Sequence, residues 1–275
     1  MRYLEYLRRL MFSPSESWMY FDQRAQKLLK KPDLSLSDVA YVSSRDYRVW
    51  PEPVYADMIN WIAEALQVSK DSDLAEIGCA AGFVAYGLSA KARSYTGVDL
   101  SPACARLATR LRLPNAAFIV GDGRSVPLED ASVDRVLCTD VIVNIPDERI
   151  YENLIREMHR ILRPGGKILL GNLNDTRPLR ADFDARIKEY SAGLPPYVED
   201  EARESGKWMP WHFNRIAEYR ARHFAPLDCD PAVFHEPAKF EAIGSALGME
   251  TNIISAHKLY PYYGFRYSVV YTRAA

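Results

Sequence analysis

Short apolar runs and amphipathic stretches alternate through the middle of the chain. The apolar runs predict strands near residues 73–77, 94–99, 116–120, 134–138 and 166–172. Apolar residues at helical spacing predict helices near residues 82–91, 102–111 and 147–162. Strands and helices that alternate in this way are typical of βαβ units, in which helices cover a parallel sheet. The pattern therefore predicts an α/β core over residues 70–173.

The stretch before this core has the spacing of helices. Leucines recur at helical intervals over residues 4–10, and Pro53 opens a further amphipathic segment that runs to Leu66. We interpret residues 1–69 as a helical N-terminal cap.

The stretch after the core differs from it in composition. Residues 174–235 are charged and aromatic, and include Pro195-Pro196 and the acidic run of residues 199–204. We interpret them as a helical insertion that forms a lid over a substrate. A helical decoration or a dimer contact is the alternative interpretation.

The last part of the chain returns to the sheet pattern. Residues 236–248 have a proline near the start and a glycine at the end, which predicts a helix. Apolar runs near residues 251–259 and 265–272 predict a pair of strands. Residues 236–275 are therefore expected to complete the core sheet.

The composition of the chain disfavours a nucleic-acid-binding protein and a membrane protein. The chain has 275 residues, of which 48% are hydrophobic, enough for one large domain or one domain with a cap. A net charge of -1 and the lack of a dense basic stripe disfavour a nucleic-acid partner. No apolar run approaches the length of a membrane span. Charged residues interrupt the N-terminal stretch, which therefore lacks the pattern of a signal peptide. We expect a cytoplasmic protein.

The spacing of the four cysteines indicates that they are reduced thiols and that they form neither a set of disulfides nor a metal site. They do not form a C-x-x-C spacing, and most lie in segments with the pattern of core or loop. They are Cys79, Cys104, Cys138 and Cys229.

The first predicted strand leads into the chemically most informative segment. Glu76 is followed by Gly78 and Gly82, where the backbone can pass close to a ligand because no Cβ intervenes. The second strand ends on Asp99. Ligands of open α/β sheets lie outside the carboxyl ends of the strands, so this carboxylate is placed to bind both hydroxyls of a ribose. The segment therefore predicts a pocket for a nucleoside cofactor.

The loop disfavours a nicotinamide dinucleotide. That cofactor's fingerprint is G-x-G-x-x-G, whose middle glycine approaches the pyrophosphate, and here this position is Ala80. The acidic Glu76 beside the loop suits a cofactor whose amino-acid end carries an ammonium. This pattern resembles the class I S-adenosylmethionine (SAM) dependent methyltransferases, in their small-molecule, type 11-like branch.

The resemblance extends over residues 70–173. It includes Gly121-Asp122-Gly123 after the third strand, the segment 126–140 around the fourth, and the turn at residues 143–147. Residues 158–167 are similar to the family's turn before strand five. The resemblance implies a Rossmann-like, doubly wound seven-stranded sheet of order 3-2-1-4-5-7-6 with an antiparallel last strand. It also implies SAM as cofactor and S-adenosyl-L-homocysteine (SAH) as product.

Two positions depart from the family's pattern, namely Ala80 and Asn144, where the family often has glycine and histidine. Asp122 is expected to accept a hydrogen bond from the adenine amino group. The expected cofactor-binding residues are Glu76, Gly78, Cys79, Ala80, Gly82, Asp99, Leu100, Gly121, Asp122, Gly123, Thr139 and Asp140.

Methyl transfer from a sulfonium needs little protein chemistry beyond alignment of the reactants and exclusion of water. A base helps only where the acceptor loses a proton. The polar candidates for a catalytic role are His212, Asp140 and Asn144, although packing is the more ordinary role for His212. The candidate substrate residues are Tyr47, Asn172, Trp208, Trp211 and Tyr263, and such aromatic side chains also fill cores.

We therefore expect a methyltransferase that acts on an oxygen or nitrogen atom of a small molecule, with no metal and a possible homodimer. One alternative is a SAM-binding enzyme with other chemistry, and another is a non-catalytic partner subunit. The intact Glu76, Asp99 and Asp122 argue against the second alternative.

Overall fold

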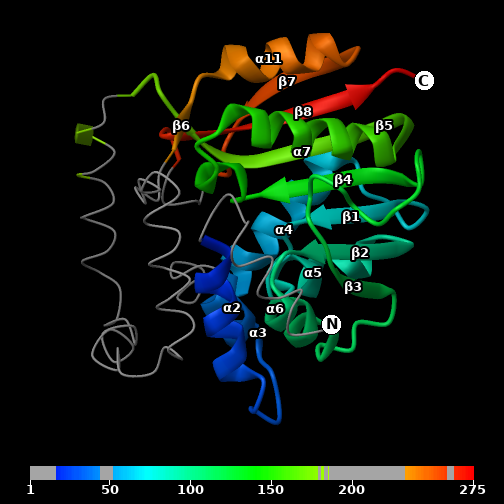
Figure 1. The fold of residues 1–275 in the computed structure, drawn as a ribbon, viewed down its shortest axis with the longest axis vertical. Coiled ribbons are helices and arrows are strands. Elements are labelled where there is room, and N and C mark those ends of the chain that lie inside the picture. Colours follow the sequence, from blue (N-terminus) through cyan, green and yellow to red (C-terminus); the bar gives the residue numbers. More distant parts are fainter. Residues whose placement is uncertain (1–16, 44–51, 179–180, 183–184, 186–232, 259–262) are drawn as a thin grey trace, which may run out of the picture.

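The computed structural model describes residues 17–43, 52–178, 181–182, 185, 233–258 and 263–275. Within these ranges eight strands form one sheet, in the order β3-β2-β1-β4-β5-β8-β7, with the short β6 paired to β5 beside this path (Figure 1). The strands are β1 (Asp73–Ile77), β2 (Ser94–Asp99), β3 (Ala116–Val120), β4 (Val133–Thr139), β5 (Leu162–Asp175), β6 (Phe234–His235), β7 (Met249–Ser255) and β8 (Arg266–Arg273).

The strand directions confirm the expected topology. β1 to β6 pair in parallel, and β8 runs antiparallel between β5 and β7. β8 and β7 take the places of the last two strands in the predicted order 3-2-1-4-5-7-6. The two-residue β6 was not predicted, because alternation cannot be recognised over so short a segment.

Helices cover both faces of the sheet (Figure 1). They are α2 (Ser17–Leu28), α3 (Leu36–Ser43), α4 (Glu52–Leu66), α5 (Phe83–Leu88), α6 (Pro102–Thr109), α7 (Glu148–Ile161) and α11 (Pro237–Ala246). Residues of α2 to α6 share one core cluster with Leu74, and residues of α7 and α11 share a second with Ala75. Since successive side chains of a strand point to opposite faces, these neighbours in β1 belong to different layers.

The predicted boundaries hold for the first three strands of the sheet. β1, β2 and β3 have the predicted bounds, whereas β5 is longer at both ends than predicted. It starts at Leu162, directly after α7, and pairs there with Val133 before the ladder shifts by an irregularity. None of the helices in the described ranges is both long and apolar enough to cross a bilayer.

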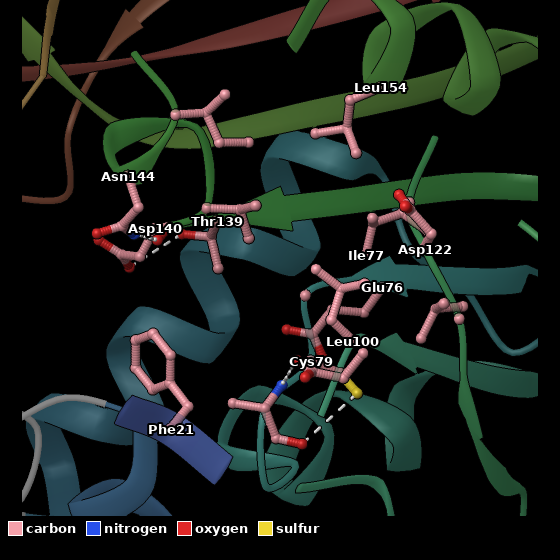
Figure 2. Close-up of a pocket in the computed structure, with 18 of the residues that line it drawn as sticks. Phe21, Glu76, Ile77, Cys79, Leu100, Asp122, Thr139, Asp140, Asn144 and Leu154 are labelled. Carbon is pink, nitrogen blue, oxygen red and sulfur yellow. Dashed lines mark hydrogen bonds between the residues drawn. The ribbon is translucent and has the colours of Figure 1, made fainter. Parts of the chain in front are cut away.

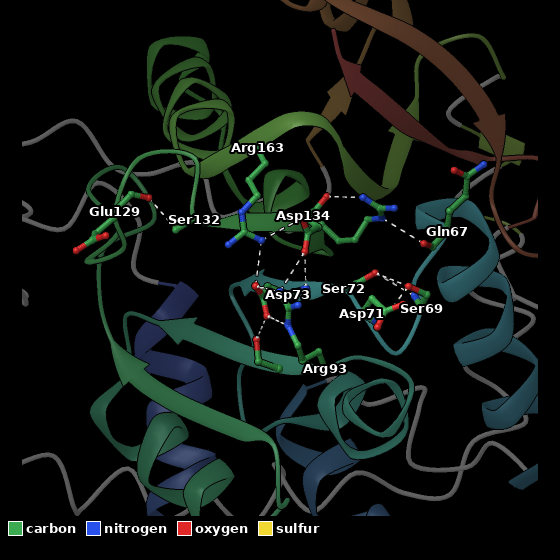
Figure 3. A network of polar contacts seen from close by, with 12 residues as sticks. Gln67, Ser69, Asp71, Ser72, Asp73, Arg93, Glu129, Ser132, Asp134 and Arg163 are labelled. Atoms are coloured by element: carbon green, nitrogen blue, oxygen red, sulfur yellow. Dashed lines mark hydrogen bonds and ion pairs between the residues drawn. The ribbon is translucent and has the colours of Figure 1, made fainter. Parts of the chain in front are cut away.

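A network of ion pairs joins the strands at the edge where β1 begins (Figure 3). Asp73 accepts hydrogen bonds from Arg93 and Arg163, at 2.9 Å from Arg93 Nε and 3.0 Å from Arg163 Nη1. Asp134 in β4 accepts from the backbone N–H of Asp73 at 2.8 Å and pairs with Arg163 Nη1 at 3.0 Å. These arginines lower the pKa of the Asp73 carboxyl below its usual value, against a smaller effect of burial. The network fixes β1, β2, β4 and β5 at the edge opposite the carboxyl ends of the strands.

Candidate active site

A cavity of about 310 Å³ opens at the carboxyl ends of β1, β2 and β4 (Figure 2). All the predicted cofactor residues except Gly82 line it, and Asn144 lines it as well. Its surface combines backbone of the glycine loops, the carboxylates of Glu76, Asp99 and Asp122, and apolar side chains such as Phe21 and Leu154.

The loop after β1 is tightly folded against β2. The N–H groups of Gly78 and Cys79 both donate to the carbonyl of Val98, at 2.7 and 3.2 Å. Gly78 has a φ of 81°, and a Cβ at this position would collide with Val141. Ala80 also has a positive φ, of 43°, in the region that glycine adopts most easily. The departure from the glycine fingerprint therefore leaves the backbone path intact and places some strain at Ala80.

Asp99 organises this loop from the end of β2. One carboxylate oxygen accepts from the backbone N–H of Ala80 and the other from that of Ser101, both at 2.8 Å. Burial raises the pKa of Asp99 to about 6, although the two backbone hydrogen bonds act in the opposite direction. Each carboxylate oxygen has a further lone pair. The side chain can thus hold the loop and still accept hydrogen bonds from a ligand's hydroxyls.

Glu76 is more deeply buried than its place in a strand-end motif suggests. Its side chain is 2% exposed and accepts a hydrogen bond from the hydroxyl of Tyr95 in β2. Burial, with a smaller contribution from the nearby Asp99, raises the pKa of Glu76 to about 8 against the opposing effect of the hydrogen bond from Tyr95. A cation in the cavity would stabilise the ionised form. The pair of carboxylates is therefore suited to a cationic ligand.

Asp122 lies at the far side of the cavity, after β3. Its carboxylate is bound by Arg124, with Nε at 3.0 Å from Oδ1 and Nη2 at 2.5 Å from Oδ2. Both side chains line the cavity and are about one-third exposed, at 33% for Asp122 and 36% for Arg124. A hydrogen bond from an adenine amino group would have to share this carboxylate with Arg124.

A polar cluster follows the ends of β4 and β5. Asn172 Nδ2 donates to Asp140 Oδ2 at 2.9 Å and to Thr139 Oγ1 at 3.1 Å. Arg266 Nη1 pairs with Asp140 Oδ1 at 3.0 Å, and Asn144 donates to the carbonyl of Asp140 at 2.8 Å. Asp140 and Asn172 have positive φ values of 57° and 63°, and strained positions of this kind cluster at functional sites.

The structure separates the predicted catalytic and substrate residues. Asp140 and Asn144 line the main cavity. Asn172 does not line it, but donates a hydrogen bond to Asp140 and lines a smaller cavity. Tyr263 is 50% exposed and lines none of the cavities named here. His212, Tyr47, Trp208 and Trp211 lie outside the described residues.

Gly82 also differs from its predicted role as a cofactor contact. It does not line the main cavity, and it precedes the first residue of α5 with a φ of 84°. A Cβ there would meet Leu111 at 3.0 Å and Ala108 at 3.3 Å. Its role in the structure is the close packing of the start of α5 against α6 and the residues that follow α6.

The cap contributes residues that sequence reasoning missed. Phe21 projects from α2 toward the cavity (Figure 2). Ser43, at the end of α3, lines the cavity as well. Ile150 and Leu154 in α7 add an apolar wall. The spacing of Ile150 and Leu154, four residues apart, is a helical signal that marks this face of α7. Nothing in the sequence around Phe21 marks it as a cavity residue.

These features fit the cofactor that the resemblance implies. SAM carries an ammonium and a sulfonium, and the cavity is lined by the buried carboxylate of Glu76 and the partly exposed carboxylate of Asp99. Residues 78–80 line the cavity, and a Cβ at Gly78 would collide with Val141, which lines it as well.

Comparisons with known proteins agree with the site. Residues 75–170 match the family model described as "Methyltransferase domain" (Methyltransf_11). Methyltransferase GfsG of Streptomyces halstedii is 26% identical over 168 residues, or 56% of each chain. A ubiquinone biosynthesis O-methyltransferase of Pseudomonas paraeruginosa is 26% identical over 189 residues, which cover 64% of this chain and 76% of the relative. The chain therefore spans little more than half the length of the first relative.

A solved structure shows the same fold. Magnesium protoporphyrin IX methyltransferase of Synechocystis PCC 6803 with bound SAH has a TM-score of 0.55 and 14% identity. The match covers 94% of this chain and 98% of that protein.

Proposed function

Because the chain belongs to the class I SAM-dependent methyltransferases, we propose that it transfers the methyl group of SAM to an oxygen or nitrogen atom of a small-molecule acceptor. One observation carries the proposal. A single cavity joins the carboxylates of Glu76 and Asp99, at the ends of β1 and β2, to the polar cluster after β4.

The cofactor end of the cavity is assigned from charge and hydrogen bonds. Asp99 would accept from the ribose hydroxyls, and Glu76 would face the ammonium end. The backbone from Gly78 to Ala80 would lie against the ligand. When bound, SAM supplies a methyl group that its sulfonium already activates.

The acceptor end is assigned to the β4 side. Asp140 and Asn144 line the cavity there, and the strained backbone of Asp140 is held by Asn172 and Arg266. Phe21 and Ile145 contribute apolar surface that excludes water from the reacting atoms. We assign positioning and desolvation as the main contributions of the protein, since in-line displacement at a sulfonium needs little else.

An oxygen acceptor has support from one relative, whose name describes an O-methyltransferase. A nitrogen acceptor would use the same geometry. Both lose a proton on methylation when they start as a hydroxyl or a protonated amine.

Titration calorimetry with SAM and SAH tests the cofactor. The wild-type protein should bind both, and Asp99→Asn should weaken binding by about 1.5–3 kcal/mol, the range for hydrogen bonds to charged groups. Asp71→Asn is the matched control, because Asp71 is an exposed carboxylate near the start of β1. No heat with SAM under conditions where a related methyltransferase binds would reject the proposal.

Methyl-labelled SAM with a panel of phenols, catechols and amines tests the reaction. Label should pass to an acceptor in the panel with formation of SAH. Conversion of an acceptor without transfer of label would instead support a SAM-binding enzyme of other chemistry.

A further inference from the structure

Methylation of a hydroxyl or an amine releases a proton, and the proton needs a route to solvent. This requirement rests on the proposed function. Asp140 is the carboxylate at the acceptor end of the main cavity, and within the described ranges no histidine lines that cavity. The structure nevertheless places a histidine close behind it.

A second, smaller cavity of about 10 Å³ lies behind Thr139. Thr139 and Val84 line both cavities, so these two side chains form part of the wall between them. The polar residues of the smaller cavity are Thr139, Asn172 and His257. A volume of this size is about that of one water molecule, and a buried water needs two to four polar partners. The smaller cavity has the minimum volume for one water and is lined by three polar residues.

His257 connects this cavity to the surface. It follows β7, and its Nε2 lies 2.8 Å from Oδ2 of Asp57 in α4. Trp61, one turn further along α4, meets the imidazole edge-on at 6.0 Å between ring centroids. The side chain of His257 is 5% exposed, whereas that of Asp57 is 48% exposed. The buried ring therefore reaches solvent through a carboxylate.

Hydrogen bonds connect the other end of the path to the main cavity. Thr139 Oγ1 donates to Asp140 Oδ2 at 3.3 Å, and Asn172 Nδ2 bonds to both atoms. The charged groups that the structure places along or beside the path are Asp57, Asp140 and Arg266, whose Nη1 pairs with Asp140 Oδ1.

We propose that the His257–Asp57 pair, reached from Thr139 through one water in the smaller cavity, carries the proton of the methyl acceptor to solvent. As the acceptor forms its bond to the methyl carbon, the S–C bond breaks and its electron pair stays on sulfur. The acceptor's O–H or N–H proton passes to Asp140. From there it moves along Thr139 and the water to His257, and Asp57 delivers it to bulk solvent. His257 and Asp57 are positioning groups of a relay, since neither lines the main cavity.

The first test is a high-resolution crystal structure of the full chain with SAH. The expected result is an ordered water within hydrogen-bonding distance of both Thr139 Oγ1 and the ring of His257. A dry cavity would overturn the relay without bearing on the methyltransferase activity.

The second test compares two methyl acceptors with SAM as donor. A catechol, 3,4-dihydroxybenzoate, loses a proton on methylation, whereas iodide accepts a methyl group and releases none. His257→Gln retains an amide that can contact Asp57 but cannot carry a proton. With catechol its kcat should fall about 100-fold, the lower limit for proton-transfer catalysis, and its pH profile should flatten. The iodide reaction should be unchanged.

Asp57→Asn should shift the catechol pH profile in the same assay, because the carboxylate that receives the proton is lost. His159→Gln is the matched control, since His159 lies in α7 and lines neither cavity. It should leave both reactions unchanged.

Equal losses with catechol and iodide would show a purely structural role for His257 and overturn the relay. A wild-type protein that binds SAM but uses neither acceptor leaves the decision to the crystal structure. A wild-type protein that does not bind SAM would instead reject the proposed function.

Discussion

Ser101 donates a hydrogen bond of 2.6 Å from its hydroxyl to the carboxylate of Asp22, across 79 positions of the chain. The same carboxylate oxygen accepts from the backbone N–H of Ala103 at 3.1 Å, in the first turn of α6. Ser101 also donates its N–H to Asp99. The helical cap is thereby joined to the loop that carries the expected ribose-binding carboxylate.

Replacement of Asp22 by Asn should therefore lower both stability and SAM affinity. The side chain is 2% exposed, so its hydrogen bonds have no water to replace them. We expect a loss of about 1.5–3 kcal/mol in the free energy of unfolding, measured by urea denaturation, and weaker SAM binding by calorimetry. Asp33→Asn, at an exposed site of the cap, is the control. Unchanged SAM affinity in Asp22→Asn would separate the cap from the cofactor loop.

Glu76 should make SAM binding depend on pH. The ionised form is disfavoured in the free protein, where the pKa is raised to about 8, and a bound ammonium would favour it. Binding below pH 8 should therefore release a proton, and SAM affinity should rise with pH toward this value. Calorimetry at pH 7 in buffers of different ionisation enthalpy measures the proton release. Glu76→Gln should abolish the part of it that this residue supplies, and equal release in both proteins would contradict the assignment.

The same group should affect stability with a defined sign. Its folded pKa of about 8 lies above the ordinary value of 4.5, so the folded protein holds a proton that the unfolded chain has lost. This contribution is complete below the ordinary pKa and is lost as pH rises through the folded one. Relative to wild type, Glu76→Gln should gain stability as pH rises from 4.5 to 8, by at most about 1.4 kcal/mol per pH unit. Chemical denaturation at several pH values measures the difference.

Asp73 should have the opposite effect in acid. Its pKa is lowered, chiefly by Arg93, so the stabilisation is present above the ordinary pKa of 3.8 and is lost as pH falls through the lower folded value. Asp73→Asn should destabilise the protein at neutral pH, and its difference from wild type should shrink in acid. A difference independent of pH would show that packing, not charge, accounts for the role of Asp73.

Gly78 and Gly165 form a matched pair for the glycine loop. Both have a positive φ, of 81° and 74°, but a Cβ at Gly78 would collide with Val141, whereas a Cβ at Gly165 meets nothing within 4 Å. Gly165→Ala should cost only the backbone strain, about 1–2 kcal/mol. Gly78→Ala should cost more and should also abolish SAM binding. Equal losses of stability would show that the contact with Val141 relaxes freely.

Periodicity predicted the core because short strands with apolar positions alternate with amphipathic helices, and β1, β2 and β3 begin and end as expected. The cofactor loops were predictable because their residues are local in sequence and their chemistry depends on residue type. Positions such as Ala80 fall into the same loop even where one glycine is absent.

The acceptor side was less predictable because its contacts are distant in sequence. Asp57 and His257 lie 200 positions apart, and no local pattern joins them. The sequence offered His212 as the candidate histidine, and this residue lies outside the described ranges. Phe21 likewise reaches the cavity through the packing of α2, which no motif encodes.

The ion pairs of Asp73, Arg93, Asp134 and Arg163 have a consequence for how this protein can diverge. They join four neighbouring strands at the edge of the sheet opposite the cavity. Substitutions among the residues that contact an acceptor can then accumulate without loosening the sheet. Related proteins can therefore acquire new methyl acceptors when a few side chains change at the carboxyl ends of the strands. The ion pairs at the opposite edge stay the same and keep the sheet stable.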